Sequence, residues 1–131
     1  MDITQKRIGI VGGGQLGKMM ILEAKWLGYY VAVLDPSADC PSSSICDHLI
    51  VGDLNDPKGY NELSKHADVI TYEWENISIP ALESLEKEGH IIYPSVDSLK
   101  KIQNKYTQNT VLKENGIPVP KFALVKNTND I

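Results

Sequence analysis

Short apolar runs alternate with amphipathic segments of helical spacing along most of this chain. The runs are rich in β-branched residues and end at Gly, Asp or Pro, which is typical of buried strands. They predict strands at 8–11, 30–34, 49–51, 69–72 and 90–93. The segments between them predict helices at 16–27, 57–66 and 80–89. Strands that alternate with helices through short links predict an α/β fold, in which helices cover both faces of a parallel sheet.

The pattern changes after Pro94. Residues 95–115 predict one long polar helix, with a break around 102–105 left open. The connector at 116–120 contains two prolines and is expected to be extended, and 122–125 predict a further strand. One helix and one strand bury too little surface for a core of their own. We therefore expect an α/β domain at 1–97 and the start of a second, incomplete domain at 98–131.

A glycine motif joins the first predicted strand to the first predicted helix. Gly12, Gly14 and Gly17 form the pattern G-x-G-x-x-G. The first glycine permits a tight turn, the second lets the backbone approach a ligand, and the third lets the helix pack close to its strand. The N-terminus of that helix favours an anion such as a phosphate. A role in packing alone stays an alternative for this motif.

Polar residues gather where the predicted strands end. Asp35 ends the second strand, where dinucleotide-binding domains place an acid that binds ribose. Glu73, Glu75 and Asn76 follow the fourth strand. Because parallel sheets bind ligands at their carboxyl ends, we interpret these three residues as acceptors for ligand hydroxyls and an amine. A solvated loop, in which Asn76 caps a turn, is the alternative.

The composition argues against nucleic-acid binding and against a membrane protein. With 131 residues, 42% of them hydrophobic, and a net charge of −4 without a basic stripe, the chain is expected to be globular and not to bind nucleic acid. The apolar runs are too short to span a membrane and the polar start is no signal peptide, so we expect a cytoplasmic protein without a membrane partner. Cys40 and Cys46 are expected to be free thiols, with a loop disulfide as the alternative.

Five motifs stand in order along the chain: GGGQLGKMM at 12–20, AVLDP at 32–36, ITYEWENI at 70–77, QNK at 103–105 and GIPVP at 116–120. Together they resemble the N5-carboxyaminoimidazole ribonucleotide synthetase family, within the ATP-grasp superfamily. The resemblance implies a Rossmann-like pre-ATP-grasp domain, followed by the first helix and strand of an ATP-grasp domain. It also implies a ligase of de novo purine biosynthesis. In that reaction ATP and bicarbonate carboxylate the amine of 5-aminoimidazole ribonucleotide, giving N5-carboxyaminoimidazole ribonucleotide, ADP and phosphate.

The resemblance implies a substrate site made of two segments. Gly14 gives the backbone access to the ligand, and Gln15 and Leu16 match positions where related enzymes contact the ribonucleotide. Glu73 matches an acid that contacts the substrate, and Asn76 lies beside it in the sequence. The first glycine motif thus resembles a site for a nucleotide substrate.

The resemblance also implies that ATP and Mg²⁺ take part. Lys105 stands where the family usually has an arginine that contacts ATP; lysine keeps the charge but loses the bidentate geometry. The remaining ATP ligands and the metal ligands of the family correspond to positions beyond residue 131. We therefore expect no catalytic residue and no metal ligand within this chain, and no activity from the chain alone. The full-length protein is implied to be a homodimer.

Two other functions stay open at this level. An NAD(P)-dependent oxidoreductase domain agrees with the glycine motif and Asp35, but leaves the 73–76 cluster and the 116–120 connector unexplained. A non-catalytic interaction module would show a closed structure with no cleft beside Gly14 and Glu73.

Overall fold

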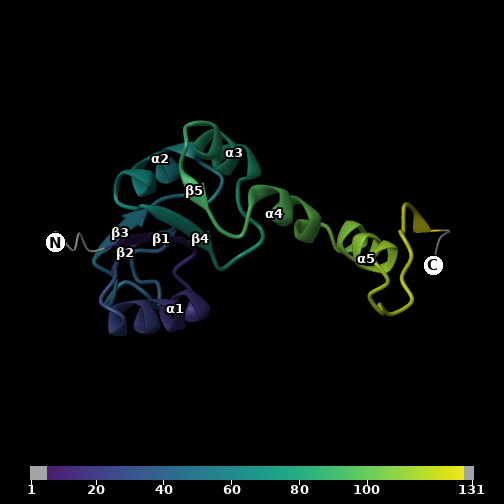
Figure 1. Ribbon diagram of the computed structural model, residues 1–131, viewed down its shortest axis with the longest axis horizontal. Coiled ribbons are helices and arrows are strands. Elements are labelled where there is room, and N and C mark those ends of the chain that lie inside the picture. The colour runs from purple at the N-terminus through teal and green to yellow at the C-terminus, as the bar shows by residue number, and fades with distance from the viewer. Residues whose placement is uncertain (1–5, 129–131) are drawn as a thin grey trace.

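A five-stranded parallel sheet forms the centre of the computed structural model, which describes residues 6–128 (Figure 1). The strands are β1 (Arg7–Val11), β2 (Tyr30–Asp35), β3 (His48–Val51), β4 (Val69–Tyr72) and β5 (Ile91–Ile92). Their order is β3-β2-β1-β4-β5, and every pair is parallel. The predicted α/β class and parallel sheet are confirmed. The strand order reverses between β1 and β4, so the ends of these two strands flank the place where such sheets bind ligands.

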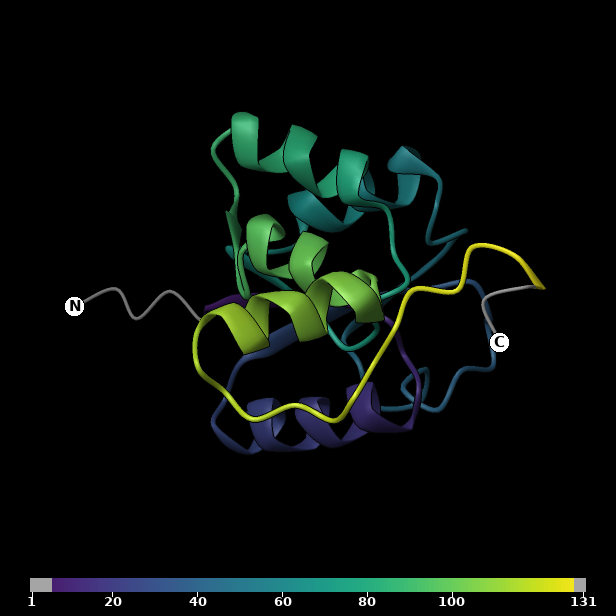
Figure 2. The same cartoon turned by 90° about the vertical axis from the view of Figure 1, so that its right-hand side faces the viewer.

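Three helices cover the two faces of the sheet. Helix α1 (Gln15–Trp26) lies on one face, and α2 (Pro57–Lys65) and α3 (Ile79–Lys87) lie on the other (Figures 1 and 2). The core has two parts. The smaller one packs β1 and β2 against Ile21 and Ala24 of α1, and the larger one packs the sheet against α2, α3 and the next helix. The three predicted helices are confirmed within one or two residues of their ends.

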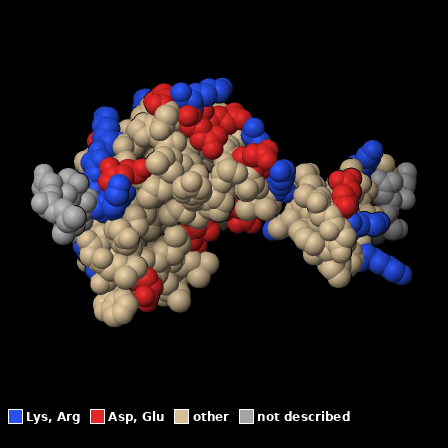
Figure 3. All heavy atoms as spheres, in the orientation of Figure 1, with Lys and Arg blue, Asp and Glu red and all other residues tan. Residues whose placement is uncertain are grey.

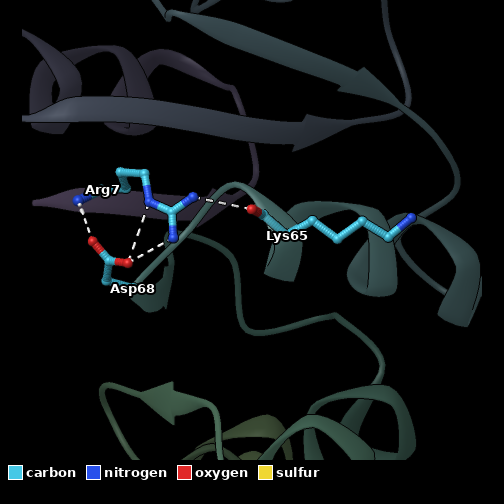
Figure 4. Close-up of polar contacts among 3 residues, drawn as sticks. All are labelled: Arg7, Lys65 and Asp68. Carbon is cyan, nitrogen blue, oxygen red and sulfur yellow. Dashed lines mark hydrogen bonds and ion pairs between the residues drawn. The ribbon is translucent and has the colours of Figure 1, made fainter.

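The amino edge of the sheet is tied together by Arg7 and Asp68 (Figure 4). The guanidinium of Arg7 donates to Asp68 Oδ1 from Nη2 at 2.7 Å and to the carbonyl of Lys65 from Nη1 at 3.1 Å. The backbone N–H of Arg7 donates to Asp68 Oδ2 at 2.9 Å. These bonds join the start of β1 to the turn between α2 and β4. The hydrogen bonds from Arg7 lower the pKa of Asp68.

The segment after Pro94 forms two helices. Helix α4 (Val96–Gln103) buries Val96 and Leu99 against the core, whereas α5 (Lys105–Glu114) buries no residue and projects from the body (Figure 1). The break lies at Asn104, whose backbone is extended and whose Oδ1 accepts from Thr107 N at 3.0 Å. The prediction of a single long helix is therefore wrong, and the break lies within 102–105, where the sequence leaves a break open. The predicted domain boundary at 97 lies within α4 and stays a prediction.

The strand predicted at 122–125 does not form. A strand needs a neighbour to complete its ladder of hydrogen bonds, and no strand between residues 6 and 128 pairs with this segment. Phe122 instead packs its ring edge-on to Tyr106 of α5, with 5.5 Å between the ring centroids. Within the same residues, no helix has both the length and the apolar content needed to cross a membrane.

Candidate functional site

The glycine turn between β1 and α1 is tightly packed. Gly12 has a φ of 100°, which a residue with a side chain rarely adopts, and its N–H donates to Leu34 O at 2.9 Å. A Cβ atom on Gly17 would lie 2.5 Å from the carbonyl oxygen of Gly12. The first and third glycines of the motif are therefore required by the turn and by the close approach of the helix, as the motif predicts.

Gly13 is as constrained as its neighbours, although the motif treats its position as variable. A Cβ atom there would lie 2.7 Å from Cys40 Sγ and 3.0 Å from Val33 Cγ1. The carbonyl of Gly13 accepts from Ser42 N at 3.0 Å, so the loop after β2 packs directly on the turn. The only signal for this constraint in the sequence is the run of three glycines. Both cysteines are free thiols, as predicted, and burial raises the pKa of Cys40.

The carboxylate of Asp35 accepts hydrogen bonds from the glycine turn and from the loop after β2. Its Oδ2 accepts from Gly13 N at 2.8 Å, and its Oδ1 accepts from Ser37 N at 2.8 Å. The two carboxylate oxygens therefore shape the two loops at the end of β2. The interpretation of Asp35 as a ribose ligand stays a prediction, since each of its carboxylate oxygens has a second lone pair beside the bond to the backbone.

The carboxylate of Glu73 lies directly over the glycine turn. A Cβ atom would come within 2.9 Å of Glu73 Oε2 if built on Gly12, and within 3.6 Å if built on Gly14. Glu73 Oε2 is buried and has no hydrogen-bond partner among residues 6–128. Burial, followed by the nearby charges of Asp35 and Glu75, raises the pKa of Glu73. A buried acceptor without a donor is costly.

The N-terminus of α1 opens onto the same place. Gly14 precedes the helix with extended backbone angles, no side chain caps the helix, and its first turn carries no acidic residue. The first N–H groups of α1 therefore remain available to an anion. Among the described residues other than its chain neighbours, a Cβ atom on Gly14 would come within 4 Å of the Glu73 carboxylate oxygens alone. Gln15 and Leu16, both exposed, begin the helix at this opening.

The structure places the other two predicted site residues elsewhere. Asn76 shares the loop of Glu73 but lines a separate open pocket of about 220 Å³ with Pro36, Asp53, Leu54, Asn55 and Trp74. Lys105 begins α5 and is exposed, with its Nζ donating to Gln108 Oε1 at 3.2 Å. The structure thus brings Gly14 close to the Glu73 carboxylate, and Gln15 and Leu16 follow Gly14 at the start of α1.

The surroundings of the site are acidic and hold no metal cluster. The space-filling view shows acidic side chains on the concave side of the molecule, between the body and the projecting α5 (Figure 3). Among the described residues, no group of three or more His, Cys, Asp or Glu side chains is arranged to hold a metal ion. Two wider open hollows, of about 670 and 760 Å³, lie along α5 and residues 116–126, and none of the predicted site residues lines them.

Comparison with known proteins gives consistent matches. The ribonucleotide synthetase preATP-grasp domain model matches residues 5–103. An N5-carboxyaminoimidazole ribonucleotide synthase from Staphylococcus aureus is 44% identical over 124 residues, which are 95% of this chain and 33% of that protein. The chain therefore spans about one third of the length of the relatives that it matches.

Two solved structures extend this result. The N5-carboxyaminoimidazole ribonucleotide synthetase of Thermotoga maritima superposes with a TM-score of 0.87 at 48% identity, covering 96% of this chain and 35% of that one. The synthase of Aspergillus clavatus, in complex with ADP and 5-aminoimidazole ribonucleotide, has a TM-score of 0.81 at 34% identity, covering 89% and 31%. The resemblance inferred from the five motifs is confirmed: this chain belongs to the ribonucleotide synthetase preATP-grasp domain family.

Proposed function

We propose that this chain forms the ribonucleotide-binding part of an ATP-dependent carboxylating ligase of de novo purine biosynthesis. The observation that carries the proposal is the buried, unpartnered carboxylate oxygen of Glu73 beside the uncapped N-terminus of α1. The names of the relatives, and the complex of the Aspergillus clavatus enzyme with 5-aminoimidazole ribonucleotide, support this choice of substrate.

The two halves of the site suit the two ends of such a ligand. The first N–H groups of α1, reached across Gly14, are donors for the phosphate of a ribonucleotide. The carboxylate of Glu73 is an acceptor for a ribose hydroxyl or for the exocyclic amine of the base. The donors bind the phosphate, and the carboxylate orients the group that carries N–H or O–H. Gln15 and Leu16 would then contact the part of the ligand that lies along the start of α1.

The chemistry of the whole reaction involves more than this chain. In the proposed reaction ATP phosphorylates bicarbonate, and the resulting carboxyphosphate delivers CO₂ to the amine of the bound ribonucleotide. Lys105, at the exposed start of α5, would contribute a positive charge to ATP. The family resemblance implies that Mg²⁺ takes part in the reaction together with ATP. Asn76 as a substrate contact, the homodimer and the cytoplasmic location also stay predictions.

Thermal unfolding of the chain with different ligands tests the proposal. A ligand that binds only the folded state raises the melting temperature. We expect 5-aminoimidazole ribonucleotide to raise it, ribose 5-phosphate to raise it less, and NAD to leave it unchanged. The variant Glu73→Gln should lose most of the response to the ribonucleotide, whereas Glu114→Gln, which changes an exposed glutamate on α5, should keep it. A larger shift with NAD than with the ribonucleotide would contradict the proposal.

A further inference from the structure

The loop between β4 and α3 carries Glu73 into the site, and its middle has few anchors. Its two ends are held by backbone bonds: Glu73 N donates to Val11 O at 3.0 Å, and Ser78 N donates to Leu54 O at 3.2 Å. Between these ends the side chain of Ile77 is buried in the core, while Trp74 is 54% exposed. Within the described part of the chain, none of the N–H groups of residues 74–77 makes a hydrogen bond.

One side chain from another element supplies the missing anchor. Gln103 Nε2 donates to the carbonyl of Glu75 at 2.7 Å and to the carbonyl of Ile77 at 2.8 Å. A primary amide has two N–H groups, so both donors of Gln103 are used on one loop. A carbonyl oxygen can accept a hydrogen bond but cannot donate one. The amide group of Gln103 must therefore present its nitrogen, and not its oxygen, to the loop.

Gln103 stands on a firmly packed support. It is the last residue of α4, which buries Val96 and Leu99 completely or nearly so. Helix α4 is also bonded to α3, since Val96 N donates to Glu86 Oε1 at 3.3 Å and Lys100 pairs with Glu83. Packing of α4 against the core thus fixes the position of the Gln103 amide, and the two hydrogen bonds from this amide hold the loop.

The residues that follow Gln103 give this contact a second consequence. Asn104 breaks the helix and caps α5, and Lys105 is the first residue of α5. The loop that carries Glu73 and the helix that carries Lys105 are therefore held by neighbouring residues of the chain.

We propose that Gln103 is a positioning residue that holds the 73–77 loop, and with it Glu73, in the geometry that receives the ribonucleotide. The identity of the ligand rests on the function proposed above, whereas the effect on the loop does not. Gln103 touches no reacting group itself. Its sequence motif marks it only as a neighbour of Lys105, and its role follows from the two bonds to the loop.

Three variants of the chain test this inference. Gln103→Leu keeps the size of the side chain and removes both donors, whereas Gln103→Lys keeps a donor at similar reach. Lys101→Leu is the matched control, because Lys101 lies on the same helix, is exposed, and pairs with Asp97. The readouts are backbone order parameters from NMR relaxation, the pKa of Glu73 from NMR titration, and the affinity for 5-aminoimidazole ribonucleotide.

In Gln103→Leu we expect the order parameters of residues 74–77 to fall from about 0.85 to below about 0.6, while those of β1 and β4 stay unchanged. The raised pKa of Glu73 should move toward its ordinary value as the loop opens to water. The affinity for the ribonucleotide should fall about tenfold, which is the size expected for the loss of two hydrogen bonds. Gln103→Lys should recover part of each change.

The inference is overturned if Gln103→Leu leaves both the order parameters of 74–77 and the pKa of Glu73 equal to those of Lys101→Leu. It is also overturned if the order parameters fall equally in β1 and β4, because that would be a general loss of stability. A failure of the proposed function looks different. In that case the wild-type chain does not bind the ribonucleotide, but the loop and the titration still respond to Gln103→Leu, which supports the positioning role for another ligand.

Discussion

The two edges of the parallel sheet differ in whether their charged side chains have partners. At the amino edge the charged groups are paired: Arg7 with Asp68, and Lys25 with Asp47, which also accepts from Val31 N at 2.8 Å. At the carboxyl edge Glu73 keeps a buried oxygen without a partner in the described chain, and α1 begins without a side-chain cap. The charged groups named at the amino edge satisfy one another, whereas the carboxyl edge leaves a buried acceptor and a helix N-terminus without partners among residues 6–128.

The pKa shifts at the two edges have opposite signs and opposite effects on stability. The hydrogen bonds from Arg7 lower the pKa of Asp68, so this pair stabilises the fold above the ordinary pKa of aspartate and stops doing so as the pH falls through the lowered value. Burial raises the pKa of Glu73. Ionisation of Glu73 therefore costs stability as the pH rises from its ordinary pKa through the raised one. The direction of the pKa shift therefore distinguishes Asp68, which stabilises the fold when ionised, from Glu73, whose ionisation destabilises it.

The largest expected effect on the free energy of unfolding comes from a substitution in the glycine turn. In Gly17→Ala the new Cβ atom would lie 2.5 Å from the carbonyl oxygen of Gly12, and because that oxygen belongs to the backbone it cannot move aside. We expect the free energy of unfolding to fall by about 3 kcal/mol in chemical denaturation. Gly14→Ala is the matched control, since its Cβ would lie no closer than 3.6 Å to any neighbour. It should cost less than about 1 kcal/mol and still weaken ribonucleotide binding. An equal loss of stability in the two variants would contradict the assignment of Gly17 to packing of the turn and of Gly14 to ligand access.

A smaller effect is expected at the amino edge. Asp68→Asn removes the charge that Arg7 pairs with, but the two side chains are 43% and 37% exposed and water screens the pair. We expect a loss of about 1 kcal/mol at neutral pH, with ribonucleotide binding unchanged. The difference from wild type should shrink as the pH falls through the lowered pKa of Asp68. Asp97→Asn, which removes an ion pair between two exposed side chains of α4, should lose less. A loss of binding in Asp68→Asn would mean that the two edges are coupled.

The smallest effect on stability has the opposite sign. Glu73→Gln removes a carboxylate whose ionisation is unfavourable in the fold, so the variant should be more stable than wild type above the raised pKa of Glu73 and equally stable below its ordinary value. Ribonucleotide binding should fall at the same time. Unfolding curves measured across this pH range give the first quantity and titration calorimetry gives the second. A variant that is less stable at every pH would show that Glu73 serves the fold.

Much of the fold was predictable because its signals are local. β-branched runs such as 8–11 and 30–34 mark strands that are buried on both faces. Asp56 and Ser78 cap α2 and α3 with their own side chains, accepting from residues two and three positions ahead. The sharp turn at Gly12 needs a residue that adopts a positive φ. Each of these signals works within a few residues and can be read without knowledge of the partner elements.

The candidate site was predictable only in outline. The edge of the sheet and Glu73 follow from the order of elements along the chain, but the partners of Asp35 and Gly13 do not, because they come from packing of the loop after β2. The strand at 122–125 was wrong for a related reason: its apolar pattern describes a segment suited to a sheet, and the pattern does not say whether a neighbouring strand is present.

The sequence by itself determined the helices and strands up to residue 94, the parallel sheet, the glycine turn and the family, since these depend on residue types and short spacings. The tertiary structure decided which polar groups are satisfied. Asp68 meets Arg7 across 61 residues, Gln103 reaches Glu75 across 28, and the buried oxygen of Glu73 meets no donor among residues 6–128. Hydrogen bonds form or fail over a few tenths of an ångström, and only the packing of distant elements sets distances of that size.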